Sequence, residues 1–573
     1  VPINDTPSMG PDGTFTVPSP ASPALEDAAL PDGWLSGEIQ ALADAVTPEA
    51  PERAAEPRKG RKGRHHRPPP PKKPPRPLHV AVAPTPRLVE ELSAMSDGYR
   101  RSDGTDASKG SPHAEGAEQT LAGLRSVIKQ RDSVQPLLVP YSFPDLPTLT
   151  QISSQDIPLQ EVLEQFSQGS QVLEDALQEK FDPAWLFPPG GRLDAATLEQ
   201  LQLSGTYGRR IATVGSTSVV PLTDTDVEGC PNAPFPGADL TFACPISVTT
   251  GGRDPSVGYA ADAGLEERLA PLTEAGANDR LTLQQFFAET SMIREELPGT
   301  ADRVVEATIP SAWHPSPRLS RILFHNLQKA PWLRSDTPEE ALRGSNAPVP
   351  RDLVDLSPTV PSDVAGDFYT GELLPAKKTI KSFAGVAEED ADRVRRLQRN
   401  LLVAESRSWW RDHGEVAGEF VERSLDEATT ELSKIKIIGV NDVTLTSSRG
   451  KFQLVLANGT DHPVTVRIAM DAQDKMEIDP ELLERLSTTY APGNHPLTIS
   501  GRANASGKFP LTVRVESGDG LLIAQKFIEV RSTAFNRIAL GITVGAFLFL
   551  LLFYLYRVIR RARHKGELEA DPA

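Results

Sequence analysis

Cysteine is scarce in this sequence, because Cys230 and Cys244 are the only two among 573 residues. Two cysteines exclude a disulfide-dense scaffold, and without Cys-x-x-Cys spacing or a companion ligand cluster they argue against zinc. They flank a loop that contains proline and glycine, CPNAPFPGADLTFAC. We expect a Cys230–Cys244 disulfide in an oxidising compartment, worth roughly 3 kcal/mol on the chain-entropy model. Two buried free thiols are the alternative.

Short catalytic motifs are also missing. The sequence has no Gly-x-Ser-x-Gly elbow and no Gly-x-x-x-x-Gly-Lys-Ser/Thr loop, so serine-hydrolase and nucleotide-hydrolase chemistry lack support. Its ten histidines form no His-x-x-x-His or His-Glu-x-x-His pattern, and we expect no metal and no cofactor. The net charge of −17 argues against bulk nucleic-acid binding.

Large apolar residues are absent from residues 48–77, a segment rich in proline, lysine and arginine. Apart from proline, this segment has no apolar residue larger than alanine. It therefore cannot join a core, and we expect a disordered insertion with polyproline character at its end. Its basic residues suit anionic wall polymers or lipid headgroups, and a merely solvated insertion is the alternative.

One long uncharged run is present near the C-terminus. IALGITVGAFLFLLLFYLY, Ile538–Tyr556, is roughly 30 Å long as a helix, the thickness of the hydrocarbon core. Arg537 precedes the run, and five basic residues follow it, namely Arg557, Arg560, Arg561, Arg563 and Lys565. Because positive charge collects on the cytoplasmic side, we expect a single-pass membrane protein with residues 1–536 extracytoplasmic and residues 557–573 cytoplasmic.

An extracytoplasmic N-terminus needs a route across the membrane. The chain opens with VPINDTPSMG, which has neither an initiator methionine nor an apolar run. We therefore expect that this sequence starts downstream of the original N-terminus.

Strand-like and helix-like segments alternate through the first 350 residues. Examples of expected strands are Leu78–Ala83 and Pro136–Ser142, and the longest expected helix is Leu159–Lys180. This alternation is typical of an α/β fold with a mostly parallel sheet, and the number of units favours a (β/α) barrel-like domain over residues 1–350.

The remaining ectodomain changes character twice. Residues 351–434 are mainly helical and predict a connector. Residues 435–532 alternate apolar and polar side chains in runs such as KFQLVLAN and KFPLTVRVES, separated by turn signals such as NGTDHP and SGDG. That pattern predicts an immunoglobulin-like β-sandwich close to the bilayer.

Several phrases together carry a resemblance to a known family. They are VPINDTPSMGPDGTF, VAVAPTPRLVEELSAMSDGYR, LLVPYSFPDLPTL, WLFPPGGRLDAATLEQL, FFAETSMIREELPG and ATIPSAWHPSPRLSRIL. With the closing sandwich and helix, the chain resembles an uncharacterised actinobacterial envelope family catalogued as a domain of unknown function. Members are often encoded beside the MviN-type lipid II flippase. The resemblance covers nearly the whole chain.

This resemblance implies a glycosidase- or deacetylase-like barrel in the cell envelope, with no assigned activity. It also implies a signal peptide and a further β-domain upstream of Val1. Members typically place Asp after the second strand, where this chain has Ala83 in VAVAPTP. That departure weakens a catalytic role for this strand end.

The candidate site residues lie where strands of the expected barrel end. Asp5 and Asp145 are the candidate catalytic carboxylates, since a glycosidase needs two facing each other. The alternative is that both only cap a loop or a helix. Tyr141, Trp185 and His314 are the candidate ligand-binding residues.

Three functions remain open at this point. The first is a non-catalytic envelope protein that binds glycan or a partner, such as lipid II flippase-type machinery, in cell-wall precursor export or assembly. The second is an active glycoside hydrolase or carbohydrate deacetylase that uses Asp5 and Asp145. The third is a scaffold that works through the sandwich and the membrane helix alone. Missing catalytic motifs on a barrel-like pattern favour the first.

Overall fold

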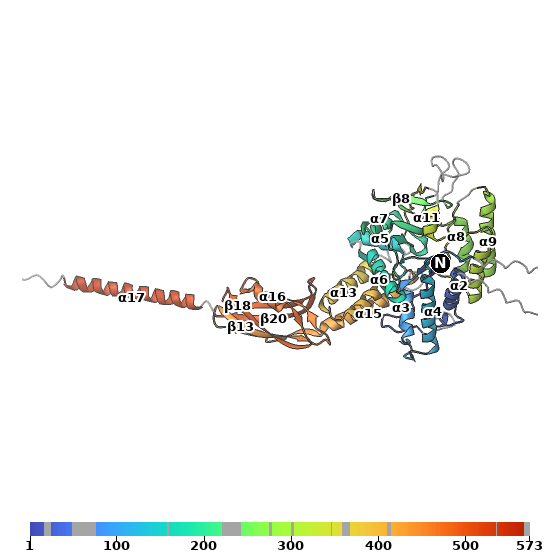
Figure 1. Cartoon of the computed structure of the whole chain (residues 1–573). Helices are drawn as coiled ribbons and strands as arrows, with labels where there is room; N and C mark the ends of the chain where they lie inside the picture. The colour runs from blue at the N-terminus through green and yellow to red at the C-terminus, as the bar shows by residue number, and fades with distance from the viewer. Residues whose placement is uncertain are drawn as a thin grey trace, which may run out of the picture. The chain divides into compact units, whose positions relative to one another are not determined.

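The computed structural model divides the chain into two compact units (Figure 1). Unit 1 comprises Val1–Leu374 and Arg399–Arg423, and unit 2 comprises Pro375–Gln398 and Ser424–Ala573. The structure describes residues 1–16, 25–47, 76–156, 160–220, 242–273, 278–299, 303–344, 347–357, 367–409, 414–533 and 536–566. Nearly all of the expected basic insertion, and Cys230, lie outside the described residues. The Cys230–Cys244 bond therefore stays a prediction.

Unit 1 is a mixed α/β fold whose parallel strands follow one another in chain order. One sheet joins β1 (Pro2–Ile3), β2 (Val80–Pro84) and β5 (Val134–Pro136), all parallel. A bridge between Leu138 and Leu186 links β5 to β6 (Trp185–Leu186). The second sheet has the order β10-β8-β9-β7-β6, with β7 (Arg210–Val214), β8 (Ile246–Val248), β9 (Ser256–Ala260) and β10 (Val349–Pro350).

The described strands do not close into a barrel. After β9, a single parallel bridge joins Ala261 to Glu306, and no pairing among the described residues joins that segment to β1. Strand β8 also runs antiparallel to β9, which breaks the parallel succession at this edge. The predicted α/β class is confirmed as a mixed α/β fold, and the described strands do not form the closed barrel that the predicted (β/α) barrel-like domain implies.

Most strand residues of unit 1 are buried, as parallel strands covered by helices require. Their core includes Ala83, Leu137, Val139, Phe143, Trp185, Phe187 and Ala212. Helices follow the strands: α2 (Trp34–Val46), α3 (Pro86–Ser96), α4 (Pro112–Ile128), α5 (Leu146–Asp156), α6 (Gln160–Leu177), α7 (Ala195–Leu203), α8 (Ala263–Leu269), α9 (Asp279–Glu296), α10 (Pro317–Lys329) and α11 (Pro338–Gly344).

The expected helical connector is not a unit of its own. Its helices are α13 (Leu374–Val386), α14 (Ala391–Ala404) and α15 (Gly414–Ser433), and each of them crosses a boundary between the two units. The end of α14 packs in unit 1, where the Asn400 amide donates to the Pro11 carbonyl at 2.9 Å. The sequence predicts that these residues are helical, but it does not reveal which turns of each helix pack in unit 1 and which in unit 2.

Unit 2 contains two four-stranded sheets. One has the order β11-β13-β18-β16 and the other β12-β20-β19-β15. The strands are β11 (Ile435–Gly439), β12 (Asp442–Leu445), β13 (Arg449–Asn458), β15 (Arg467–Asp471), β16 (Met476–Ile478), β18 (Gly493–Ala503), β19 (Gly507–Glu516) and β20 (Leu522–Ser532). In β13, Phe452, Leu454 and Leu456 are buried while the intervening side chains are more exposed, the two-residue period of a half-buried strand.

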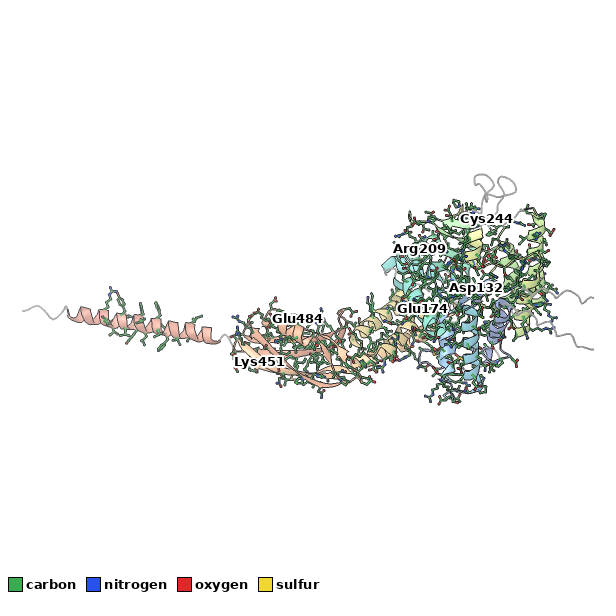
Figure 2. The ribbon with its side chains drawn as sticks, in the orientation of Figure 1. Asp132, Glu174, Arg209, Cys244, Lys451 and Glu484 are labelled. Atoms are coloured by element: carbon green, nitrogen blue, oxygen red, sulfur yellow. The ribbon has the colours of Figure 1, made fainter. Side chains whose placement is uncertain are left out.

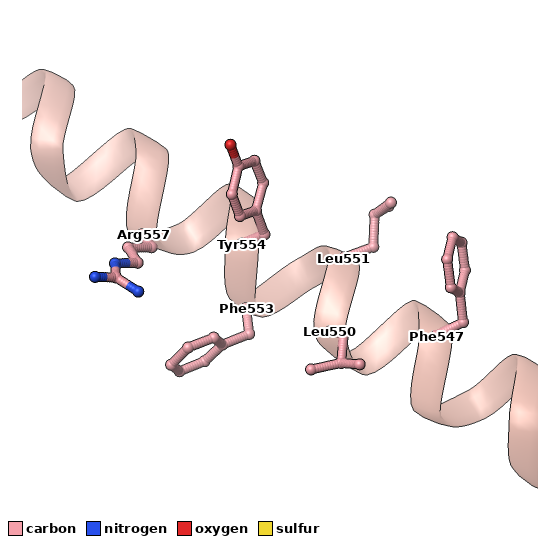
Figure 3. A pocket seen from close by; sticks show the side chains of 6 residues that line it. All are labelled: Phe547, Leu550, Leu551, Phe553, Tyr554 and Arg557. Atoms are coloured by element: carbon pink, nitrogen blue, oxygen red, sulfur yellow. The ribbon is translucent and has the colours of Figure 1, made fainter.

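The chain ends in the helix α17 (Asn536–Gly566). Within it, Gly541–Arg561 is long and apolar enough to cross a membrane, and this stretch is not buried in the protein. Figure 3 shows Phe547, Leu550, Leu551, Phe553 and Tyr554 projecting from different sides of this helix, followed by Arg557. Aromatic and aliphatic side chains exposed all round a helix suit a lipid environment, so an apolar C-terminal helix of membrane-spanning length is confirmed at the expected location.

Candidate strand-end site

The first strand delivers Asn4 and Asp5 to the carboxyl edge of the sheet. Strand β1 ends at Ile3, and its neighbour β2 ends at Pro84 in parallel register. The residues that follow the two strands therefore meet, and the Thr85 hydroxyl donates to Asn4 Oδ1 at 2.8 Å. Asp5 lies one residue further, where polar side chains gather in open α/β sheets.

Asp5 meets His314 and Trp34, which come from distant parts of unit 1. His314 Nε2 lies 3.5 Å from Asp5 Oδ1. The imidazole stacks on the Trp34 ring with centroids 4.1 Å apart and an interplanar angle of 15°. The side chain of His314 is 36% exposed and that of Asp5 is 10% exposed, so the group is open on the histidine side. We call Asp5, His314 and Trp34 the strand-end site.

Close packing of two helices places Trp34 against His314. Trp34 is the first residue of α2, and His314 shortly precedes α10. Gly37, one turn into α2, lies so near Pro317 of α10 that a Cβ at residue 37 would come within 2.4 Å of Pro317 Cβ. Only glycine permits this approach, which holds the tryptophan beside the histidine.

Burial changes the protonation of both titratable groups in the strand-end site. It raises the pKa of Asp5 to about 7, and the nearby Glu91 carboxylate adds to the rise, while a hydrogen bond from the Thr6 amide opposes it. Burial also lowers the pKa of His314. Near neutral pH the site therefore combines a neutral imidazole with a carboxyl group whose pKa is close to the ambient pH. General acid–base chemistry works best with such a pKa.

Tyr141 belongs to a buried charge network beside α3 rather than to an open surface. Its hydroxyl is bonded to Glu90 and accepts from Arg87 Nη1 at 3.0 Å. The same arginine donates to Glu91 at 2.9 Å, and Arg399 Nη1 donates to Glu90 at 2.5 Å. Tyr141 has no exposed surface, so in this structure its predicted ligand-binding role has no access to a ligand.

Asp145 is held in an ion pair with Arg192. Arg192 Nε donates to Asp145 Oδ1 at 2.7 Å, and the Thr148 hydroxyl donates to Oδ2 at 2.5 Å. Asp145 immediately precedes α5 and is 3% exposed. Among the described residues Asp145 bonds Arg192 and Thr148, whereas Asp5 faces His314, so the two candidate catalytic carboxylates have different partners. Its position directly before α5 is the one that the helix-capping alternative assigns to Asp145.

Trp185 lies in the core at the start of β6. It is 3% exposed, and the Arg210 guanidinium covers its ring at 5.3 Å from the centroid. Of the five predicted site residues, the structure thus brings Asp5 and His314 into contact, whereas Tyr141, Asp145 and Trp185 are buried against other partners. Trp34 was not among the predicted site residues. The sequence feature that could have pointed to it is the rarity of tryptophan, since the chain has six.

Among its described residues, unit 2 contains one group with metal-ligand chemistry, Asp390, Asp461 and His462, whose ligand atoms all lie within 4.8 Å of one another. The Arg393 guanidinium lies 3.0 Å from Asp390 and 3.9 Å from Asp461. A positive side chain therefore already neutralises these carboxylates, which favours an ion-pair cluster over a cation site.

The fold defines a mixed α/β protein with a two-sheet β domain and an apolar C-terminal helix. The chain belongs to the Family of unknown function (DUF6049), whose sequence profile matches residues 260–573, more than half of the chain. The comparison with curated proteins found no match to this sequence.

Solved structures resemble only a small part of the chain. WR4, a C. elegans MSP family member, is 9% identical and matches 18% of this chain and 99% of its own, with a TM-score of 0.14. The ASH/PapD-like domain of human CEP192 is 11% identical over 18% of this chain and 85% of its own, with a TM-score of 0.14. Native alpha-2-macroglobulin from Escherichia coli, in a structure that spans domain MG7 to the C-terminus, is 19% identical over 17% of this chain and 16% of that one, with a TM-score of 0.13.

Proposed function

We propose that this chain is a membrane-anchored envelope protein that binds a glycan or a partner protein without catalysis, in cell-wall precursor export or assembly. One observation carries the non-catalytic part: Asp145, the expected second carboxylate, is buried and paired with Arg192 at 2.7 Å. A glycosidase mechanism needs two carboxyl groups that both face the substrate. The stacked Trp34 and His314 rings beside Asp5 suit recognition of a sugar ring or an extended peptide.

The proposal includes the orientation of the chain in the membrane and the fold classes of the two units. The basic cluster after Tyr556 supports a cytoplasmic tail and an extracytoplasmic position for residues 1–536. The strand succession in unit 1 supports kinship with glycosidase- or deacetylase-like barrels, and the two facing sheets of unit 2 support an immunoglobulin-like class. Actinobacterial origin and a link to MviN-type lipid II flippase machinery belong to the same proposal.

The binding function can be tested on the full-length protein in detergent micelles. We expect it to bind peptidoglycan fragments or wall polysaccharides with no products in the same samples. Trp34→Ala should weaken binding about tenfold, because stacking on an aromatic ring is lost. Trp332→Ala is the matched control, since Trp332 is partly buried elsewhere and donates to Thr290. Binding unchanged by Trp34→Ala would remove the strand-end site from this role.

The alternative is an active glycoside hydrolase or carbohydrate deacetylase. The observation in its favour is that Asp5, with its pKa raised to about 7, lies 3.5 Å from His314. Such an enzyme would release products from peptidoglycan fragments, and Asp5→Asn would abolish turnover while preserving binding. Product release that survives in Asp5→Asn and disappears in Asp145→Asn would point to the other carboxylate.

A further inference from the structure

A polar pocket of about 450 Å³ lies at the amino ends of β5 and β6. The turn before β5, the loop before β6 and the helix α11 line it, and Asp132 of that turn is labelled in Figure 2. Parallel strands begin at one edge of a sheet and end at the other. The pocket therefore lies at the opposite strand edge from Asp5, and we call it the amino-edge pocket.

Gln135, in the wall of the amino-edge pocket, has a buried hydrogen-bond donor without a partner among the described residues. This residue of β5 lines the pocket and is 8% exposed. Its Oε1 accepts from the Glu339 amide at 2.8 Å, and a backbone N–H can only donate, so the orientation of the side-chain amide is determined. Its Nε2 has no hydrogen-bond partner in the part of the chain that the structure describes. A buried donor left unpaired is costly, so Gln135 requires an acceptor.

The charges around the pocket are nearly balanced. Four carboxylates and three cationic side chains line it, and several already form pairs. Arg343 bonds Glu339 at 2.7 Å, and Glu340 bonds His79 at 2.9 Å. An anionic ligand would meet the four carboxylates, and a metal ion would meet the three cations and the amide donor. A neutral ligand avoids both penalties.

The remaining polar groups require a ligand that both donates and accepts hydrogen bonds. Exposed Asp132 and Asp182 offer acceptors, while Gln135 and exposed Lys180 offer donors. All but three of the lining residues are polar or charged, and Trp185 among the three is almost fully buried. An apolar or aromatic ligand therefore finds no matching surface. Sugar hydroxyls donate to carboxylates and accept from amides and ammonium groups at the same time.

We propose that the amino-edge pocket binds a neutral sugar unit, with Gln135 Nε2 donating to a hydroxyl or acetamido oxygen. Because this pocket and the strand-end site lie at opposite strand edges, the inference does not depend on Trp34, His314 or Asp5. It adds a second glycan contact to the one in the proposed function.

The test measures binding of three trisaccharides to the full chain in detergent micelles by titration calorimetry. The probes are chitotriose and maltotriose, which are neutral, and trigalacturonate, which is anionic. We expect a neutral trisaccharide to bind, and Gln135→Glu to weaken it by roughly tenfold, because this change keeps the acceptor for the Glu339 amide and removes the donor. Lys180→Ala, at the exposed rim, should weaken binding several-fold. Gln40→Glu on an exposed face of α2 is the control.

The outcomes separate the two sites. Neutral binding that falls in Gln135→Glu and Lys180→Ala, with an unchanged urea unfolding midpoint, supports the amino-edge pocket. Neutral binding that falls only in Trp34→Ala overturns this inference and supports the strand-end site. Preference for trigalacturonate, or no binding of either neutral probe, also overturns it. If the Gln135→Glu variant does not fold, the effect of Lys180→Ala on trisaccharide binding decides for or against the amino-edge pocket, because Lys180 is exposed.

Discussion

The carboxylate of Asp5 lies 3.5 Å from Nε2 of His314, although more than 300 residues separate them in the sequence. Trp34 completes the contact by stacking on the imidazole. This relationship defines a site at the carboxyl edge of the sheet that contains one carboxyl group, one imidazole and one indole. It differs from the facing pair of carboxylates expected of a glycosidase.

The stability of unit 1 should fall as pH rises because of Asp5. Folding raises the pKa of Asp5 from 3.8 to about 7. The contribution of the protonated Asp5 carboxyl to the stability of unit 1 is therefore fully present below pH 4 and is lost as pH rises through 7. Asp5→Asn removes this titration and should gain on the order of 4 kcal/mol relative to the native protein between pH 4 and pH 8. Urea unfolding followed by tryptophan fluorescence reports on unit 1, whose ranges contain every tryptophan. Asp97→Asn, at a 74% exposed side chain, should show no such gain.

Glycine 37 should be required where α2 crosses α10. Alanine favours helix by about 1 kcal/mol over glycine, but a Cβ here would lie 2.4 Å from Pro317 Cβ. We expect Gly37→Ala to lower the free energy of unfolding by about 1–3 kcal/mol through overpacking. The same fluorescence titration measures it.

The control for this substitution is Gly418→Ala in α15. A Cβ at residue 418 would be 3.8 Å from the nearest atom, an ordinary contact with Glu372. This variant should gain up to about 1 kcal/mol. Equal effects at residues 37 and 418 would contradict the close approach of α2 and α10.

Arg87 should be the most costly charge to remove from unit 1. It is 4% exposed and neutralises Glu91, which is 1% exposed, at 2.9 Å. Arg87→Met leaves that carboxylate buried without its cation and should cost roughly 3–5 kcal/mol. Arg100→Met removes an exposed cation that lies 3.6 Å from Asp106 and should change stability by less than about 0.5 kcal/mol. The double variant Arg87→Met/Glu91→Met should recover part of the loss, and failure to do so would argue that Arg87 acts through packing alone.

A charge in the middle of α17 should weaken membrane insertion. Leu551 lies halfway along Gly541–Arg561. Leu551→Arg should make insertion less favourable by about 3 kcal/mol, on the scale measured for arginine at a helix centre. Alkaline extraction of membranes should then release more of the variant than of Leu551→Phe. Equal retention of both variants would count against a spanning helix.

Properties encoded in short windows could be read from the sequence. The apolar run Ile538–Tyr556 predicted a membrane-length helix, and α17 contains it, because nineteen uncharged residues determine both helix length and lipid compatibility locally. The two-residue period of KFQLVLAN likewise reappears as β13, because alternation alone decides which face is buried. Where strands are only two residues long, as in β1 and β6, such a window carries little signal.

Contacts between distant segments were decided only by the tertiary structure. The sequence places Asp5 and Asp145 alike after apolar segments, and nothing local shows that Arg192 would bind one and His314 would face the other. Sheet closure also depends on pairings such as Ala261 with Glu306, across a long connection. Local hydropathy determines whether a segment is a helix, a strand or a membrane span. Which side chains meet at a site depends on how all those segments pack into one core, a property of the whole chain.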